Sequence, residues 1–132
     1  MPEVRRLDHL VLTVRNIDRS VAFYSQVMGM SAEAFTPSDG TRRMALKFGQ
    51  QKINLHQAGD EFRPHAAHPG TGSADLCFLT DMPLPDWQTH LAEFHVNIEE
   101  GPVMRTGATG PIQSIYVRDP DGNLIEISTP LT

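Results

Sequence analysis

The chain repeats one pattern of hydrophobic and polar positions. Residues 7–14 alternate between the two classes at the period of a half-buried strand, and residues 20–28 place hydrophobic side chains at helical spacing. Residues 73–80 and 84–94 repeat this order of strand and helix. The repeat predicts two copies of one small module.

Polar residues occupy matching positions in the two copies. When the copies are aligned, His9 falls on Asp75, and Asn54, near the end of the first copy, falls on Glu126. Ionisable side chains in otherwise hydrophobic strands are costly to bury without a shared partner. We therefore expect the two modules to face each other and to gather these four residues in one pocket.

Three further strands follow the helix in each copy. They are predicted at residues 31–36, 42–48 and 52–57 in the first copy and at 99–104, 112–118 and 124–128 in the second. Asn16 or Asp18 is expected to cap the first helix, and Gly29 to end it. In the turn at 119–123, Gly122 or Asn123 is expected to take the left-handed position.

Two segments rich in glycine and proline separate the predicted elements. Residues 58–72 are interpreted as the linker between the modules, and Gly101–Pro111 as a mobile loop at the rim of the pocket. The predicted fold class is therefore α+β. One domain, 1–132, is expected to contain two βαβββ modules, 5–57 and 73–129, that form a cupped mixed sheet with the helices outside.

Composition and charge narrow the function classes. The net charge is −5, which argues against a nucleic-acid partner because no basic surface is available to neutralise phosphates. No hydrophobic stretch reaches the length of a membrane span or a signal-peptide core, so we expect a cytoplasmic protein. The single cysteine, Cys77, excludes an internal disulfide and is expected to be a small buried hydrophobic residue.

Several motifs together resemble the vicinal oxygen chelate superfamily. They are the strand at 7–10 with His9, the helical motifs at 20–24 and 27–30, and the closing segment 119–126. The superfamily includes glyoxalase I, the fosfomycin-modifying enzymes, the extradiol dioxygenases and the bleomycin-resistance proteins. Through residues 52–56 and 68–77 the chain most resembles the group called glyoxalase domain-containing protein 5.

The resemblance implies a metal site, with one ligand from the first and last strand of each module. Its members here are His9, Asn54 or His56, Asp75 and Glu126. A workable set is His9, His56 and Glu126, with Asp75 either as a fourth ligand or as a residue behind the ligands, and imidazole with carboxylate suits Zn, Ni, Mn or Fe. Asn54 and His56 lie two residues apart and so share a face, and which of them reaches the site stays open.

The same residues also have alternative roles that involve no metal. His9 fits a packed or solvated histidine, Glu126 an outward-facing charge, and Asp75 a strand-start cap or ion-pair partner. Asp75 stands where many family members have histidine, and Asn54 where glyoxalase I has a carboxylate. These two departures argue against glyoxalase I activity itself.

The expected function is that of a metal-dependent enzyme with glyoxalase-like lyase or isomerase chemistry on a small oxygen-bearing substrate. Glu126 and Asp75 are the candidate proton-transfer groups. The candidate substrate-binding residues are Arg105, Thr106, Tyr116 and Asn54. The alternatives are a metal-free drug- or toxin-binding protein and an extradiol-type dioxygenase. The resemblance also implies a homodimer.

Overall fold

The computed structural model describes residues 1–131, and the chain divides into two compact units, Met1–Thr71 and Gly72–Thr132. The division falls inside the segment between Gln57 and Asp75, which contains neither helix nor strand. Each unit has the same order of elements and is an α+β structure with the βαβββ arrangement predicted from the repeat. The units are called unit 1 and unit 2 below.

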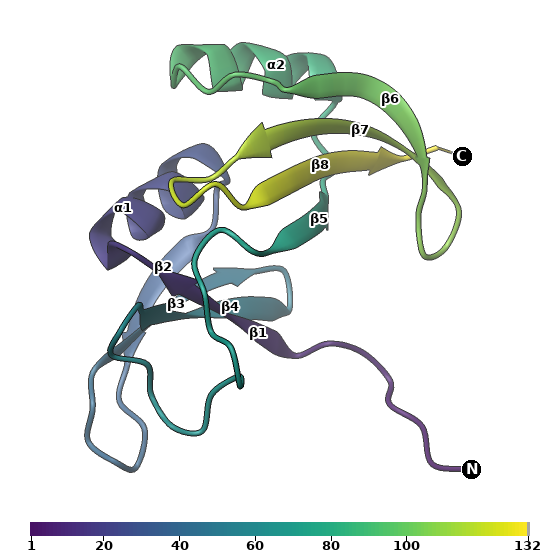
Figure 1. The fold of residues 1–132 in the computed structure, drawn as a ribbon. Coiled ribbons are helices and arrows are strands. Elements are labelled where there is room, and N and C mark those ends of the chain that lie inside the picture. The colour runs from purple at the N-terminus through teal and green to yellow at the C-terminus, as the bar shows by residue number, and fades with distance from the viewer. Residues whose placement is uncertain (132) are drawn as a thin grey trace. The chain divides into compact units, whose positions relative to one another are not determined.

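Unit 1 contains one helical segment and a four-stranded mixed sheet (Figure 1). Its elements are β1 (His9–Val14), α1 (Ile17–Ala22), a wider π-helical turn η1 (Phe23–Val27), β2 (Ser31–Phe35), β3 (Arg43–Phe48) and β4 (Gln51–Gln57). The strand order is β1-β4-β3-β2, with β1 parallel to β4 and the other pairs antiparallel. Each predicted strand of this unit is therefore present, with boundaries shifted by at most two residues.

Local side-chain chemistry sets the limits of the first helix. The side chain of Asn16 accepts a hydrogen bond from the backbone N–H of Arg19 at 3.0 Å, which satisfies an otherwise unpaired amide of the first turn. After η1, Gly29 has φ of 76°, the left-handed conformation that ends helices. Asn16 is thus the cap, and the predicted role of Gly29 is confirmed.

Unit 2 repeats the arrangement. Its elements are β5 (Asp75–Leu79), α2 (Leu84–Glu93), β6 (Glu100–Thr106), β7 (Pro111–Arg118) and β8 (Leu124–Pro130). The strand order is β5-β8-β7-β6, again with one parallel pair, β5 with β8, and two antiparallel pairs. Figure 1 shows α2 running alongside this sheet.

Alternation along the strands gives each sheet one hydrophobic face. In unit 1 the fully buried side chains include Leu46 and Ile53. In unit 2 they include Ile115, Ile125 and Ile127, and α2 contributes its own buried residues, Trp87 among them. The residues between these positions point to the opposite face of each sheet, where the polar candidates lie.

The predicted mobile loop at Gly101–Pro111 is wrong for most of its length. β6 extends through Thr106, so the connection to β7 is only residues 107–110. β6 is an edge strand, and its register shifts between Glu100 and Val103, which is where a strand tolerates glycine and proline. Glycine and proline therefore mark an irregular edge strand here.

The turn before β8 fixes the register of that strand. Oδ1 of Asp119 accepts hydrogen bonds from the backbone N–H groups of Asp121 and Asn123, each at 2.9 Å. Gly122 takes the left-handed conformation with φ of 87°. Oδ1 of Asn123 also accepts from the backbone N–H of Ala74 at 2.9 Å, tying the turn to the residue before β5. Glu126 is thereby held in one fixed place on the sheet.

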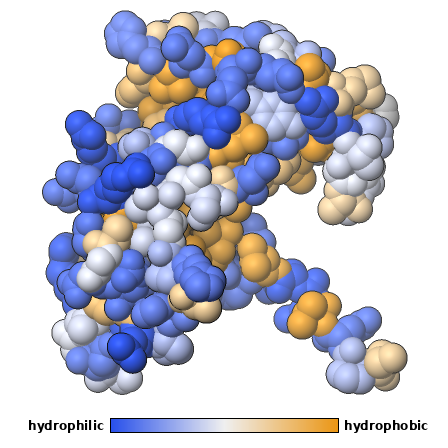
Figure 2. Space-filling view, in the orientation of Figure 1, coloured by the Kyte–Doolittle hydropathy of each residue, from blue (hydrophilic) through white to orange (hydrophobic). Residues whose placement is uncertain are grey.

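Most of the visible surface is hydrophilic. Figure 2 shows this surface interrupted by hydrophobic groups along the N-terminal segment, where Val4 is 96% and Leu7 54% exposed. Among residues 1–131 no helix has the length and hydrophobicity needed to cross a membrane.

Candidate functional site

The two units place their polar candidates at equivalent strand positions. In unit 1, Asn54 pairs with Val11 of β1, two residues after His9. In unit 2, Glu126 pairs with Cys77 of β5, two residues after Asp75. The correspondence inferred from the sequence, His9 with Asp75 and Asn54 with Glu126, is therefore present in the registers of the two sheets.

A cavity of about 500 Å³ opens on the polar face of the unit 2 sheet. Two of the predicted substrate-binding residues, Arg105 and Thr106, line it together with Glu126. Hydrophobic side chains supply other parts of its wall, among them Leu79 and Ile112. A cavity of this size, with hydrophobic walls and a few polar groups, is the usual form of a small-molecule site.

Glu126 is anchored in this cavity by buried hydroxyl groups. Oγ of Ser114 donates to Oε2 of Glu126 at 2.5 Å, and Oγ of Ser128 donates to the same oxygen at 3.4 Å. The two serines are fully buried, and their oxygens lie 2.7 Å apart. A carboxylate that accepts hydrogen bonds from rigid buried donors has a restricted rotamer, so this network fixes where the charge of Glu126 lies.

Cys77 lies on this face, which corrects the prediction that it is buried. Its side chain is exposed and lines the cavity, because strand alternation turns Leu76 and Phe78 to the other side. Sγ of Cys77 lies 3.3 Å from Oγ of Ser128. Desolvation, together with the nearby charge of Glu126, raises the pKa of the thiol, so Cys77 is a protonated thiol at neutral pH and a weak nucleophile.

Arg105 holds the phenol of Tyr116 in place. Nε of Arg105 donates to the Tyr116 hydroxyl oxygen at 2.9 Å, and its other two nitrogens donate to the Met104 carbonyl at 3.0 Å and to Glu100 at 2.6 Å. The three nitrogens of the guanidinium are thus engaged within unit 2. Tyr116 is the cross-strand partner of Glu126. Arg105 therefore acts on the cavity by orienting Tyr116.

Burial and the nearby carboxylate keep the Tyr116 phenol protonated. Desolvation is the largest influence and raises its pKa above 10.0, and Glu126 adds to the rise through its charge and a hydrogen bond. The hydrogen bond from Arg105 acts in the opposite direction. The phenol oxygen accepts from Arg105 and its proton is directed to Glu126, so a ligand oxygen that binds this proton has to compete with Glu126.

Asp75 lies at the first position of β5, where its side chain is exposed. It shares a sheet face with Cys77 and Glu126, since all three are an even number of residues apart in the register. Its charge affects the pKa values of Cys77 and Arg118. Asp75 is thus on the face predicted for it, at the end of the strand.

In unit 1, His9 is positioned by the residue before it. Nδ1 of His9 lies 2.9 Å from a carboxylate oxygen of Asp8, and the hydrogen bond between them lowers the pKa of Asp8. When Nδ1 carries the proton of this bond, Nε2 keeps a lone pair for a metal or a ligand proton. A carboxylate behind an imidazole is the usual second partner of metal-binding histidines.

Asn54 and His56 share the face of His9 but differ in their surroundings. Among the described residues, Oδ1 of Asn54 and Nδ1 of His56 are buried and have no hydrogen-bond partner. His56 is only 5% exposed, and its ring is nearly perpendicular to that of Phe62, with the two ring centroids 5.4 Å apart. Burial, followed by the charge of Arg43, lowers the pKa of His56, so the imidazole is neutral at pH 7.

The strand register places His56 further from His9 than Asn54 is. His9 pairs with Lys52, so Asn54 lies two residues further along β4 and His56 four. At the rise of a strand these offsets are about 7 Å and 13 Å. Within neither unit do three His, Cys, Asp or Glu side chains of residues 1–131 come together as a metal site. The ligand set His9, His56, Asp75 and Glu126 stays a prediction.

Sequence reasoning missed the two serines that hold Glu126. Ser114 and Ser128 are uncharged and carry no motif of their own. The available signal was strand period: residue 128 is two after Glu126, and residue 114 is two before Tyr116, so both had to share the face of those residues. A serine on the polar face of a sheet whose neighbouring residues are hydrophobic indicates a polar partner that needs a donor.

Comparisons with known proteins agree with this architecture. A family model described as Glyoxalase/Bleomycin resistance protein/Dioxygenase superfamily matches residues 6–127. The chain is 55% identical over 125 residues to the virulence protein STM3117 of Salmonella typhimurium, an alignment covering 95% of this chain and 84% of the relative. It is 28% identical over 126 residues to the metallothiol transferase FosB of Staphylococcus haemolyticus, covering 96% of this chain and 84% of the relative.

A solved structure has nearly the same fold over its whole length. The integron cassette protein VCH_CASS1 from the mobile metagenome of V. cholerae superposes with a TM-score of 0.92 at 55% sequence identity. The match covers 98% of each chain.

Proposed function

Because the chain belongs to the Glyoxalase/Bleomycin resistance protein/Dioxygenase superfamily, we propose that it is a metal-dependent enzyme acting on a small oxygen-bearing substrate. The chemistry proposed is a proton transfer of the lyase or isomerase type. The observation that carries the proposal is Glu126, a carboxylate fixed by the Ser114 hydroxyl at 2.5 Å inside a cavity of about 500 Å³.

The side chains present are suitable for a divalent metal ion. His9 has a carboxylate at one ring nitrogen, Glu126 is held by Ser114, and Asn54 has a buried oxygen without a partner among the described residues. Nitrogen and oxygen donors of these kinds are those that Zn, Ni, Mn and Fe accept. The FosB relative, a metallothiol transferase by name, supports a metal in this superfamily.

The proposed ligands are His9, His56, Asp75 and Glu126, with Asn54 as the alternative to His56. A bound divalent ion would supply Lewis-acid stabilisation of negative charge on a substrate oxygen. Metal analysis of single variants would show which of the ligands belong to the same ion.

The residues of unit 2 have distinct proposed roles in proton transfer. Glu126 accepts a proton from a carbon next to a substrate carbonyl and returns it to the product, and its position limits the geometry of that step. The Tyr116 hydroxyl donates a hydrogen bond to the oxygen on which charge develops. Arg105 keeps the phenol oriented, and Thr106 lines the cavity beside it. Asp75 is the second candidate for proton transfer, at the end of β5.

Elemental analysis by mass spectrometry tests the proposal directly. Protein purified without a histidine tag is expected to hold about one metal ion per chain, and the Glu126→Ala and His9→Ala variants are expected to lose it. The Cys77→Ser variant, which changes a neighbour on the same face, is the matched control and should keep its metal. If both ligand variants kept their metal, the proposed ligand set would be refuted.

A second candidate function is metal-free sequestration of a small molecule. The hydrophobic part of the unit 2 cavity, with Leu79 and Ile112 in its wall, favours a binding protein for an organic ligand. Retention of an aromatic ligand by protein treated with a chelator would support this function over the enzyme.

Membership of the glyoxalase domain-containing protein 5 group, a homodimer and a cytoplasmic location stay predictions. Light scattering tests the homodimer.

A further inference from the structure

The only two lysines of the chain face each other across one strand pair. Lys47 of β3 and Lys52 of β4 are direct cross-strand partners, and every other permanently basic side chain is an arginine. Directly opposite residues of an antiparallel pair have Cβ atoms about 5 Å apart, and like charges there destabilise the sheet. This placement concentrates two positive charges on one face of unit 1, where an anion could interact with both.

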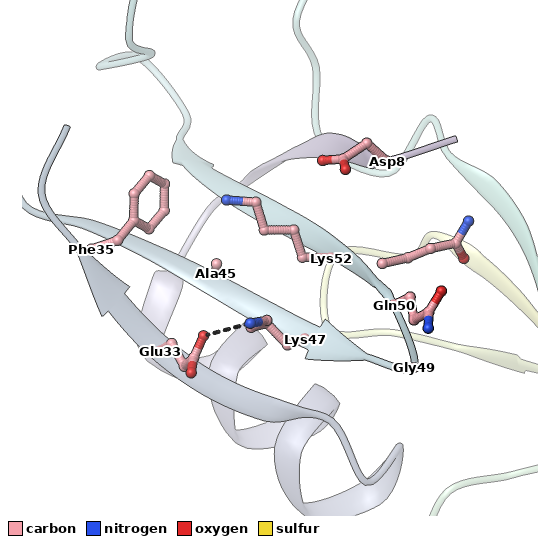
Figure 3. Close-up of a pocket in the computed structure, with 9 residues that line it drawn as sticks. Asp8, Glu33, Phe35, Ala45, Lys47, Gly49, Gln50 and Lys52 are labelled. Atoms are coloured by element: carbon pink, nitrogen blue, oxygen red, sulfur yellow. Dashed lines mark ion pairs between the residues drawn. The ribbon is translucent and has the colours of Figure 1, made fainter. Parts of the chain in front are cut away.

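The two lysines line a cavity of about 350 Å³ on the polar face of the unit 1 sheet. Figure 3 shows the side chains of Lys47 and Lys52 above the strands, with Ala45 on the floor near them and Phe35 at one end. The small side chain of Ala45, which is 2% exposed, leaves the space open. The cavity has room for a small metabolite or for the charged end of a larger one.

The carboxylates of this cavity are largely occupied. Glu33 lies 3.6 Å from Nζ of Lys47, as the dashed line in Figure 3 marks, and both side chains are half exposed. The carboxylate of Asp8 is paired with His9 at 2.9 Å. An exposed ion pair such as that of Glu33 with Lys47 contributes little to stability, so an incoming anion can compete with it.

Lys52 has an aromatic partner, and its charge also acts on the carboxylate of Asp8 and lowers the pKa of that group. Its Nζ lies 4.3 Å from the centroid of the Phe35 ring, and no carboxylate of residues 1–131 makes an ion pair with it. The ring face holds the ammonium over the cavity without cancelling its charge. Lys52 is therefore a positioned cation whose hydrogen-bond donors are available to a ligand.

From these observations we propose that the cavity between Lys47 and Lys52 binds the oxyanion group, phosphate or carboxylate, of a small molecule. Lys52 is the primary contact of the ligand. Lys47 is the second contact, and its ion pair with Glu33 is broken when the ligand binds. An oxyanion between the two ammonium groups removes their mutual repulsion and satisfies their donors. This site lies beside His9, whose partner Asp8 also lines the cavity, but it uses neither Glu126 nor a metal. Anion binding to metal-free protein therefore tests it separately from the proposed function.

The scarcity of lysine makes the test selective. Reductive methylation with ¹³C-formaldehyde keeps the charge of lysine and yields two lysine signals in an NMR spectrum, apart from that of the N-terminal amine. Inorganic phosphate and acetate are titrated separately at constant ionic strength, with chloride as the balancing anion. Both lysine signals should shift in a saturable way and report the same dissociation constant.

Four variants distinguish a built site from net charge. Lys52→Gln and Lys47→Gln should each weaken binding by about tenfold, measured by calorimetry on unmethylated protein. Glu33→Gln should strengthen binding, because it frees Lys47. Arg19→Gln, which removes one positive charge from an exposed position on α1 of the same unit, should leave binding unchanged.

The outcomes decide the proposal and the class of anion. Saturable binding of phosphate alone assigns a phosphate-bearing ligand, and saturable binding of acetate alone assigns a carboxylate. Absence of saturation with either anion overturns the proposal. Equal weakening in the Arg19→Gln and lysine variants would also overturn it, as would weaker binding by Glu33→Gln.

Discussion

The Ser114 hydroxyl donates a hydrogen bond of 2.5 Å to Oε2 of Glu126, from a side chain that is fully buried. The two residues come from adjacent strands, β7 and β8, and the hydroxyl of Ser128 lies 2.7 Å from that of Ser114. Short hydrogen bonds to a charged acceptor are among the stronger ones in proteins. Glu126 therefore keeps its orientation without any ligand present.

Replacing Ser114 with alanine should release this orientation. We expect Ser114→Ala to lower metal affinity by about tenfold, as removal of a residue that orients a metal ligand commonly does. The free energy of unfolding should fall by about 1 kcal/mol, the usual effect of losing one hydrogen bond. Metal titration and urea unfolding measure the two effects.

Ser25→Ala is the matched control, because Oγ of Ser25 donates to the carbonyl of Val21 within the helical segment of unit 1 at 2.6 Å, away from the candidate site. It should leave metal affinity unchanged. If Ser114→Ala lost stability but bound metal as tightly as the parent, Ser114 would have a structural role only.

The Tyr116 phenol should ionise only in strongly alkaline solution. Burial raises its pKa above 10.0, and Arg105 partly opposes the rise through its hydrogen bond to the phenol oxygen. Removal of that bond in Arg105→Gln should therefore move the ionisation to still higher pH. Ultraviolet absorbance of tyrosinate follows the titration, and the Tyr116→Phe variant identifies the signal against that of Tyr24, the chain's other tyrosine. A Tyr116 midpoint below 10 would contradict this environment.

His56 should make unit 1 less stable in mild acid. Burial lowers its pKa below the ordinary 6.5, so the unfolded chain takes up a proton before the folded one does. Stability is therefore fully present above pH 6.5 and is lost as the pH falls from there through the folded pKa. Urea unfolding at pH 7.5 and 5.5 should show this loss in the parent and a smaller loss in His56→Gln.

The exposed His68 provides the comparison for His56. His68→Gln, in the same unit, should show the full acid sensitivity of the parent. An equal response of the parent and His56→Gln would mean that the imidazole of His56 is protonated as readily in the folded chain as in the unfolded one.

Sequence pattern was sufficient for the elements and their order. The helix start at Asn16, the left-handed Gly29 and the turn at 119–123 were predictable because each depends on side chains within a few residues. Internal repetition also gave the equivalence of Asn54 and Glu126, since both follow a turn that sets the register of the last strand.

Two local predictions failed where a longer-range effect prevailed. Cys77 was expected to be buried because its neighbours in sequence are hydrophobic, but the pairing of β5 with β8 places it opposite Glu126 on the exposed face. The glycines and prolines of Gly101–Pro111 indicated a loop, but pairing with β7 carries the strand through Thr106. In both cases the partner strand decided the outcome.

By itself, the sequence determined an α+β chain of two βαβββ modules and the sheet faces that carry His9, Asn54, Asp75 and Glu126. Those features follow from period, capping and turn chemistry, which act over short distances. Tertiary structure alone decided which hydroxyls hold Glu126, that Arg105 orients Tyr116, that Phe62 contacts His56, and that the only two lysines of the sequence stand opposite each other. The reason is physical: such contacts join residues from separate strands or loops, whose meeting depends on the register and packing of the sheet.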